Sequence, residues 1–118
     1  MMNVLIVDDS KAMRMIISRT IRQAGYGDGV LREASDGAEA LAAIQTDEPD
    51  LVLSDWNMPE MNGIELLRAL RETGCNVRFG FVTSESTTDM REQAIAAGAE
   101  FLIAKPFTAE DFADVFEG

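Results

Sequence analysis

Four short apolar runs in this chain each end beside a chemically reactive polar side chain. The runs and the polar residues that follow them are Val4–Val7 with Asp8 and Asp9, Leu51–Leu53 with Asp55, Phe79–Val82 with Thr83, and Phe101–Ala104 with Lys105. If these runs are parallel strands of one sheet, their carboxyl ends lie at one edge, where side chains distant in sequence come together. The pattern predicts a site for a divalent cation and a phosphoryl group.

The composition indicates a single compact domain. The chain has 118 residues, of which 47% are hydrophobic, so it can bury a sizeable core without a metal or a disulfide. Its one cysteine, Cys75, has no partner for an internal disulfide, and no apolar stretch approaches the length of a membrane span. The start of the chain does not resemble a signal peptide. We expect one domain over residues 1–118, located in the cytoplasm.

Charge and the missing histidine limit the chemistry. With 21 acidic and 10 basic residues the net charge is -11, which disfavours nucleic acid and anionic membranes and favours cations or basic protein surfaces. The chain contains no histidine, which excludes the Ser-His-Asp arrangement and most transition-metal sites. Any reaction must therefore use carboxylate, hydroxyl and amine groups.

Strand and helix patterns alternate along the whole chain. The predicted strands are Asn3–Val7, Val30–Ala34, Asp50–Ser54, Val77–Val82 and Glu100–Ala104. Of the five predicted helices, the first lies between Asp9 and Gly25, and the second runs from a cap at Ser35 or Asp36 to before Pro49. The third runs from a cap at Asn62 to Gly74, and the fourth spans Thr87–Ala97 and is ended by Gly98. The last begins at a cap at Thr108 and includes Phe112 and Phe116. Such alternation gives a parallel sheet with helices on both faces and a ligand crevice at its carboxyl edge.

A nucleotide-binding sheet of the Rossmann type is the alternative architecture. That fold needs a glycine-rich first turn so that the backbone can approach phosphate, whereas this turn reads Asp8-Asp9-Ser10-Lys11. The acids favour a metal site instead.

The combined motifs resemble the receiver domains of two-component response regulators. They are an acid pair (Asp8 and Asp9), an acceptor acid (Asp55), Thr83-Ser84, and Lys105-Pro106. The segment Asp55–Pro59 with Gly63 is especially similar to single-domain chemotaxis regulators of the CheY type. The resemblance covers the whole chain and implies a flavodoxin-like (βα)5 three-layer sandwich with strand order 2-1-3-4-5, as in CheY.

The resemblance assigns Asp55 as the phosphoryl acceptor, which forms an acyl phosphate. It implies that Asp8 and Asp55 are metal ligands, that Asp9 binds directly or through water, and that the Asn57 backbone carbonyl is a further ligand. The expected cofactor is Mg²⁺, which Mn²⁺ or Ca²⁺ can replace in crystals. Carboxylates ~5 Å apart repel by about 3 kcal/mol per ionised pair at an effective dielectric of 20, and a shared cation relieves that repulsion.

Thr83 and Lys105 complete the expected phosphoryl site. By the resemblance, Lys105 pairs with Asp55 and then with a phosphoryl oxygen, and the Lys105–Pro106 bond is cis. Asn57 and Glu85 are expected to flank the attacking water and tune dephosphorylation. Their polar character favours faster self-hydrolysis than a hydrophobic pair would allow.

The expected output is a switch in which the Thr83 hydroxyl moves inward and biases a surface formed by the fourth helix, the fifth strand and the last helix. The family often has Tyr or Phe three residues before the lysine, but this chain has Leu102, and the two-residue strand period places Phe101 on the other face. The last helix has four acids and no lysine, which favours a basic target: Glu110, Asp111, Asp114 and Glu117. No feature identifies a flagellar motor component as that target.

The chain is therefore predicted to be a signalling module and not an enzyme, promoting only its own phosphorylation and dephosphorylation. Its phosphoryl donor is expected to be a histidine kinase or a phosphotransfer domain, and the module to be a monomer or weak dimer. A non-phosphorylated pseudo-receiver is the alternative, although such proteins typically lack one of the acids, the threonine or the lysine. A phosphatase or phosphotransferase with an aspartyl nucleophile would need a second acid where Asn57 stands.

Overall fold

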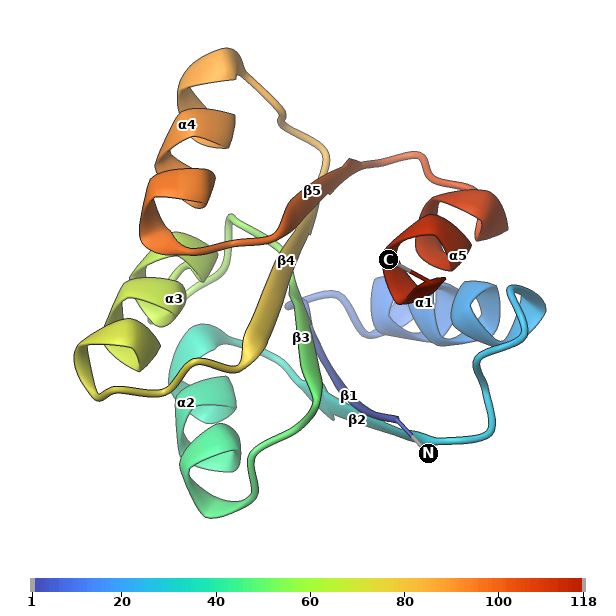
Figure 1. Cartoon of the computed structure of the whole chain (residues 1–118), viewed down its shortest axis with the longest axis horizontal. Coiled ribbons are helices and arrows are strands. Elements are labelled where there is room, and N and C mark those ends of the chain that lie inside the picture. The colour runs from blue at the N-terminus through green and yellow to red at the C-terminus, as the bar shows by residue number, and fades with distance from the viewer. Residues whose placement is uncertain (1, 118) are drawn as a thin grey trace.

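Five strands alternate with five helices in the computed structural model, which describes residues 2–117 (Figure 1). The elements are β1 (Asn3–Val7), α1 (Lys11–Gln23), β2 (Val30–Ala34), α2 (Gly37–Thr46), β3 (Leu51–Ser54), α3 (Gly63–Glu72), β4 (Arg78–Thr83), α4 (Thr88–Ala97), β5 (Phe101–Ala104) and α5 (Ala109–Glu117).

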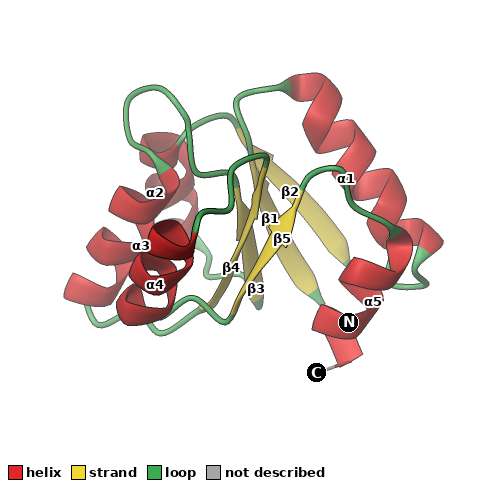
Figure 2. Ribbon diagram, turned by 90° about the horizontal axis from the view of Figure 1, so that it is seen from above, coloured by secondary structure: helices red, strands yellow, loops and turns green. Residues whose placement is uncertain are grey.

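All neighbouring strands pair in parallel, in the order β2-β1-β3-β4-β5. Figure 2 shows the sheet as a central layer, with α1 and α5 on one face and α2, α3 and α4 on the other. The predicted flavodoxin-like three-layer fold and strand order are confirmed. β2 and β5 form the two edges of the sheet, and β1, β3 and β4 lie between them.

Two hydrophobic cores hold the layers together, one on each face of the sheet. Successive residues of β1 alternate between them, because side chains of a strand point to opposite faces. Leu5 and Val7 pack in the core under α2, α3 and α4, and Val4 and Ile6 in the core under α1 and α5. Burial on both faces explains why the central strands read as continuous apolar runs and not as alternating ones.

Side chains cap the start of four helices by accepting a backbone N–H from the first turn: Ser10, Asp36, Asn62 and Thr87. Of the two candidates for the second helix, Asp36 is therefore the cap. The last helix begins at Ala109, directly after the predicted cap Thr108, but the capping contact there involves the Thr108 backbone. The backbone N–H of Thr108 donates to the Asp111 carboxylate at 2.8 Å, so an acid of the first turn stabilises this end.

Four strand boundaries, in three of the strands, differ from the predictions by one residue. Asp50 and Glu100 lie just before β3 and β5, although each donates a backbone hydrogen bond to the neighbouring strand. β4 begins at Arg78 instead of Val77 and includes Thr83, which is in register with Ala104 of β5. Such differences arise because hydrogen bonding fades gradually at the end of an element.

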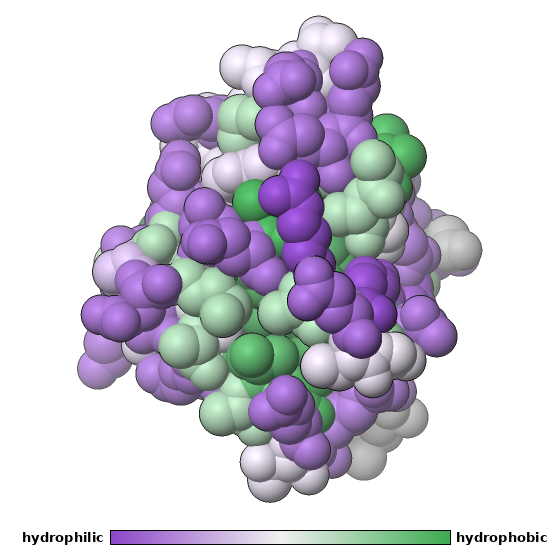
Figure 3. All heavy atoms as spheres, turned by 90° about the vertical axis from the view of Figure 1, so that its left-hand side faces the viewer, coloured by the Kyte–Doolittle hydropathy of each residue, from purple (hydrophilic) through white to green (hydrophobic). Residues whose placement is uncertain are grey.

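The surface over α2, α3 and α4 shows mostly polar side chains, with apolar ones visible between them (Figure 3). Among residues 2–117, none of the helices has both the length and the apolar character needed to cross a membrane.

Candidate functional site

The backbone itself brings the polar residues to one edge of the sheet. Just beyond three strands, the N–H groups of Asp8, Asp55 and Lys105 each donate to the neighbouring strand. Asp8 reaches Ala34 of β2 at 3.1 Å, Asp55 reaches Val7 of β1 at 2.9 Å, and Lys105 reaches Thr83 of β4 at 2.9 Å. The backbone hydrogen bonds of the sheet thus place these three residues at the same edge of the sheet, independently of their side-chain contacts.

Three carboxylates meet at this edge. Asp8, Asp9 and Asp55 can each offer one oxygen such that these atoms all lie within 4.8 Å of one another. Asp8 is buried, with 1% of its surface exposed, whereas Asp55 is half-buried and Asp9 is exposed. The cluster is therefore buried on the side of Asp8 and open to solvent on the side of Asp9. An ion or a ligand can enter and leave from the open side.

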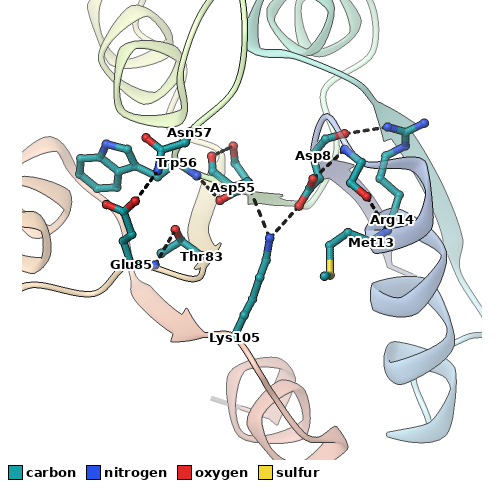
Figure 4. A network of polar contacts seen from close by, with 11 residues as sticks. Asp8, Met13, Arg14, Asp55, Trp56, Asn57, Thr83, Glu85 and Lys105 are labelled. Carbon is teal, nitrogen blue, oxygen red and sulfur yellow. Dashed lines mark hydrogen bonds and ion pairs between the residues drawn. The ribbon is translucent and has the colours of Figure 1, made fainter.

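Lys105 points into the acid cluster and not into solvent. Its Nζ lies 2.9 Å from Oδ2 of Asp8 and 3.3 Å from Oδ2 of Asp55, with 15% of its side chain exposed (Figure 4). The Lys105–Pro106 peptide bond is cis, the isomer that the resemblance implies. One ammonium thus offsets part of the charge of three carboxylates, and the remaining negative charge favours a further cation.

The environment shifts the pKa of the Asp55 carboxyl and the pKa of the Lys105 ammonium. Burial raises the pKa of the Asp55 carboxyl, and the charge of Asp8 adds to this, while Lys105 and the Trp56 N–H oppose it. Burial alone would lower the pKa of the Lys105 ammonium, but its hydrogen bond to Asp8 and the charges of Asp55 and Asp8 outweigh burial and raise the pKa. The ammonium is therefore held charged beside an acid whose ionised form is partly destabilised.

This donor set fits Mg²⁺. The ion is hard, prefers oxygen ligands, and is usually bound by one or two carboxylates while it keeps several waters. The converging carboxylate oxygens of Asp8, Asp9 and Asp55 supply such ligands, and the exposure of Asp9 leaves room for water.

Thr83, Asn57 and Glu85 lie together next to Asp55 (Figure 4). The buried Thr83 accepts the Glu85 backbone N–H on its Oγ1 at 3.3 Å. The Asn57 side-chain amide donates to the Glu85 carboxylate at 3.3 Å, and both side chains are exposed. The two positions expected to tune dephosphorylation are thus in direct contact, at the open side of the site.

The loop after β3 is fixed close to Asp55. The Trp56 N–H donates to Oδ1 of Asp55 at 2.7 Å, and the Trp56 carbonyl accepts the Gly63 N–H at 2.8 Å. A Cβ at Gly63 would overlap the Asp55 carbonyl and approach the Phe81 ring, so the start of α3 packs against the acceptor only because this residue is glycine. The buried Trp56 ring lies 4.8 Å from that of Phe81, and because the backbone N–H of Trp56 contacts Asp55, the Trp56 fluorescence can report on the site.

Two contacts to Asp8 were not predicted. The Ser10 N–H donates to Oδ1 of Asp8 at 2.9 Å, and the Arg14 guanidinium donates to the Asp8 carbonyl at 2.7 Å (Figure 4). In the sequence, Ser10 is notable only as part of the turn after the first strand, and nothing marks Arg14 as a residue of the site. The only sequence feature that could have indicated these contacts is an arginine on the helix that follows the acid pair. That feature does not show where the guanidinium points.

Leu102 and Phe101 on β5 have the arrangement that the strand period predicts. Leu102 packs against the core beneath α4, and Phe101 packs against the opposite core with α5. A groove of about 290 Å³ lies between α4 and β5, with Leu102 and the exposed Ile95 among its lining residues.

A match to a known family identifies the family to which this fold belongs. Residues 4–117 match the family described as response regulator receiver domain. The chain belongs to this family. It is therefore a receiver domain of the two-component response regulators, and the sequence-based identification is confirmed.

Relatives of this receiver domain include chemotaxis proteins. The chemotaxis protein CheY of Pseudomonas aeruginosa is 40% identical over 111 residues, which span 92% of this chain and 88% of that protein. CheY-3 of Vibrio cholerae is 38% identical over 110 residues, spanning 92% of this chain and 83% of that protein. The solved structure of Vibrio cholerae CheY4 superposes with a TM-score of 0.86 at 34% identity, covering 99% of this chain and 97% of that one.

Proposed function

We propose that this receiver domain accepts a phosphoryl group on Asp55 from a phosphohistidine of a sensor kinase or a phosphotransfer domain. The observation that carries the proposal is the position of Lys105, whose ammonium lies between the carboxylates of Asp8 and Asp55. A stabilising ion pair needs only one acid. An ammonium shared by two acids, beside a third, provides the positive charge that a transferred phosphoryl group requires.

In the proposed reaction a carboxylate oxygen of Asp55 attacks phosphorus. The bond between phosphorus and the imidazole nitrogen breaks, and the imidazole leaves with its electron pair as the acyl phosphate forms. Lys105 and the Thr83 hydroxyl stabilise charge on the phosphoryl oxygens. Mg²⁺ held by Asp8, Asp9, Asp55 and the Asn57 carbonyl would add further neutralisation of that charge.

The acyl phosphate is removed by water, and we propose that Asn57 and Glu85 set its lifetime. Their side chains contact each other at 3.3 Å at the exposed side of the site. An amide and a carboxylate can hold a water molecule, which an apolar pair would exclude, so these residues favour hydrolysis over long-term storage.

The output surface of the proposal comprises α4, β5 and α5. Thr83 is the last residue of β4 and is in register with Ala104 of β5. An inward shift of the Thr83 hydroxyl would therefore act on β5, which lines the groove beside α4. Because α5 carries Glu110 and Asp111 in its first turn and no base in its last, a partner with basic residues fits this surface.

Trp56 fluorescence tests the proposal. The protein is titrated with Mg²⁺ and then with acetyl phosphate, and we expect two successive changes because Trp56 adjoins Asp55. Asp55→Asn should abolish the response to acetyl phosphate, and Glu92→Gln, an exposed acid on α4, should leave both responses intact. If the folded protein responds to neither, the proposal is wrong and the pseudo-receiver alternative is favoured.

A further inference from the structure

Every hydrogen-bonding group of Asp8 has a partner in the structure. Its N–H donates to Ala34 at 3.1 Å, Oδ1 accepts from the Ser10 N–H at 2.9 Å, and Oδ2 accepts from Lys105 at 2.9 Å. The carbonyl accepts from Nη1 of Arg14 at 2.7 Å. β1 ends at Val7, so the sheet ladder does not supply this last bond, and the Arg14 side chain supplies it instead.

Arg14 is itself held in place from a third element. Its Nε donates to the Glu33 carboxylate of β2 at 2.8 Å, and 14% of its side chain is exposed. The planar guanidinium therefore joins α1, the end of β1 and β2 through two donors at fixed positions. A lysine has a single ammonium on a flexible stem and does not reproduce this geometry.

The pair also leaves the charge of the site unchanged. Arg14 alone would place a positive charge beside the residues proposed to bind Mg²⁺ and would repel the ion. Glu33 cancels that charge, so the pair can fix the backbone without weakening the field of the three carboxylates.

We propose that Arg14, held by Glu33, is a positioning residue that fixes the backbone at Asp8 so that its carboxylate is oriented for Mg²⁺. The inference rests on the proposed function, because it assumes that the acid cluster binds this ion. Partners that orient metal ligands typically contribute about 10- to 100-fold to metal affinity, which makes the effect measurable.

The double variant Arg14→Gln/Glu33→Gln separates positioning from charge, since it removes one positive and one negative group. Mg²⁺ binding is measured by isothermal titration calorimetry on protein shown to be folded by circular dichroism. We expect the dissociation constant to rise about tenfold. Arg19→Gln is the matched control on α1, because Arg19 is exposed and makes no hydrogen bond or ion pair within the described part of the chain, and it should change the constant by less than about twofold.

The change in the Mg²⁺ dissociation constant distinguishes an effect of positioning from an effect of charge. If Arg14 acted only through its charge, the charge-balanced double variant would leave Mg²⁺ binding unchanged, whereas positioning predicts weaker binding. Arg14→Lys keeps the charge and should fall between the wild type and the double variant, and it serves as the test if the double variant does not fold.

An unchanged dissociation constant in the folded double variant would overturn the inference while leaving the proposed function intact. Loss of stability alone cannot mimic the expected result, because the constant is measured on folded protein. Absence of Mg²⁺ binding by the wild type would overturn the proposed function and this inference with it.

Discussion

Lys105 lies closer to Asp8 than to the proposed acceptor. Its Nζ is 2.9 Å from Oδ2 of Asp8 and 3.3 Å from Oδ2 of Asp55. Because Asp8 is also a proposed Mg²⁺ ligand, the ammonium and the ion compete for the same carboxylate. We infer that Lys105 must shift towards Asp55 when the ion binds, which is where a transferred phosphoryl group needs it.

Lys105→Met should therefore change Mg²⁺ binding and phosphoryl transfer in opposite directions. Removing the competing cation should tighten Mg²⁺ binding several-fold, while phosphorylation by acetyl phosphate should slow by about 100-fold because the charge on the phosphoryl group loses a donor. Calorimetry and a phosphorylation time course measure the two effects. Weaker Mg²⁺ binding together with unchanged phosphorylation would show that Lys105 only holds the fold.

Asp55→Asn should stabilise the protein in the absence of divalent ions. The amide keeps an acceptor for the Trp56 N–H but removes a negative charge from a cluster whose burial raises the pKa of this carboxyl. In EDTA we expect the melting temperature to rise by about 4 °C, the shift that about 1 kcal/mol produces in a domain of this size. The exposed Glu92→Gln should leave it unchanged, and a lower melting temperature for Asp55→Asn would contradict the idea that acceptor and cluster repel.

Gly80→Ala should destabilise the sheet because of Phe101. The two residues are in register on β4 and β5, and a Cβ at Gly80 would overlap the Phe101 ring. Overpacking of this kind costs about 1–3 kcal/mol. The double variant Gly80→Ala/Phe101→Leu should recover part of that loss in urea unfolding, since the ring no longer occupies the space. Equal destabilisation in both variants would show that the ring is not the cause.

The Cys75 thiol should react slowly with iodoacetamide at neutral pH. Burial raises its pKa, and the hydrogen bond to Glu48, at 2.9 Å, adds to this. Only the thiolate reacts, so the reaction rate rises with pH as the thiol ionises, and a raised pKa shifts this rise in rate to higher pH. Glu48→Gln should move that rise to lower pH and increase the rate at pH 8, whereas the adjacent Asp47→Asn should not. A rate profile unaffected by Glu48→Gln would contradict the proposed contact.

The arrangement of the acids, Thr83 and Lys105 could be predicted because it depends on strand direction. Each lies at the end of an apolar run, and parallel pairing places such ends at one edge whatever the intervening sequence does. The glycine and asparagine signals at Gly98 and Asn62 were reliable for a similar reason. A left-handed backbone angle and a capping box depend only on residues within one turn.

The roles of Arg14 and Phe101 could not be predicted in this way. Each depends on a contact between elements far apart in sequence, namely Arg14 with Glu33 of β2 and Phe101 with Gly80 of β4. Helix spacing indicates which face a side chain is on, but not which carbonyl a long guanidinium reaches. The start of the last helix was predicted correctly at Thr108, but the sequence did not show that the Asp111 carboxylate would accept the Thr108 N–H there.

The central claim is that Asp55 is phosphorylated to an acyl phosphate in a site that depends on Mg²⁺. The most direct test is to incubate the protein with acetyl phosphate, with and without Mg²⁺, and to locate the modification by mass spectrometry after trapping the acyl phosphate with borohydride. We predict modification at Asp55 only when Mg²⁺ is present, and none in Asp55→Asn. A folded protein that binds Mg²⁺ yet stays unmodified, or is modified equally in EDTA, would contradict the account.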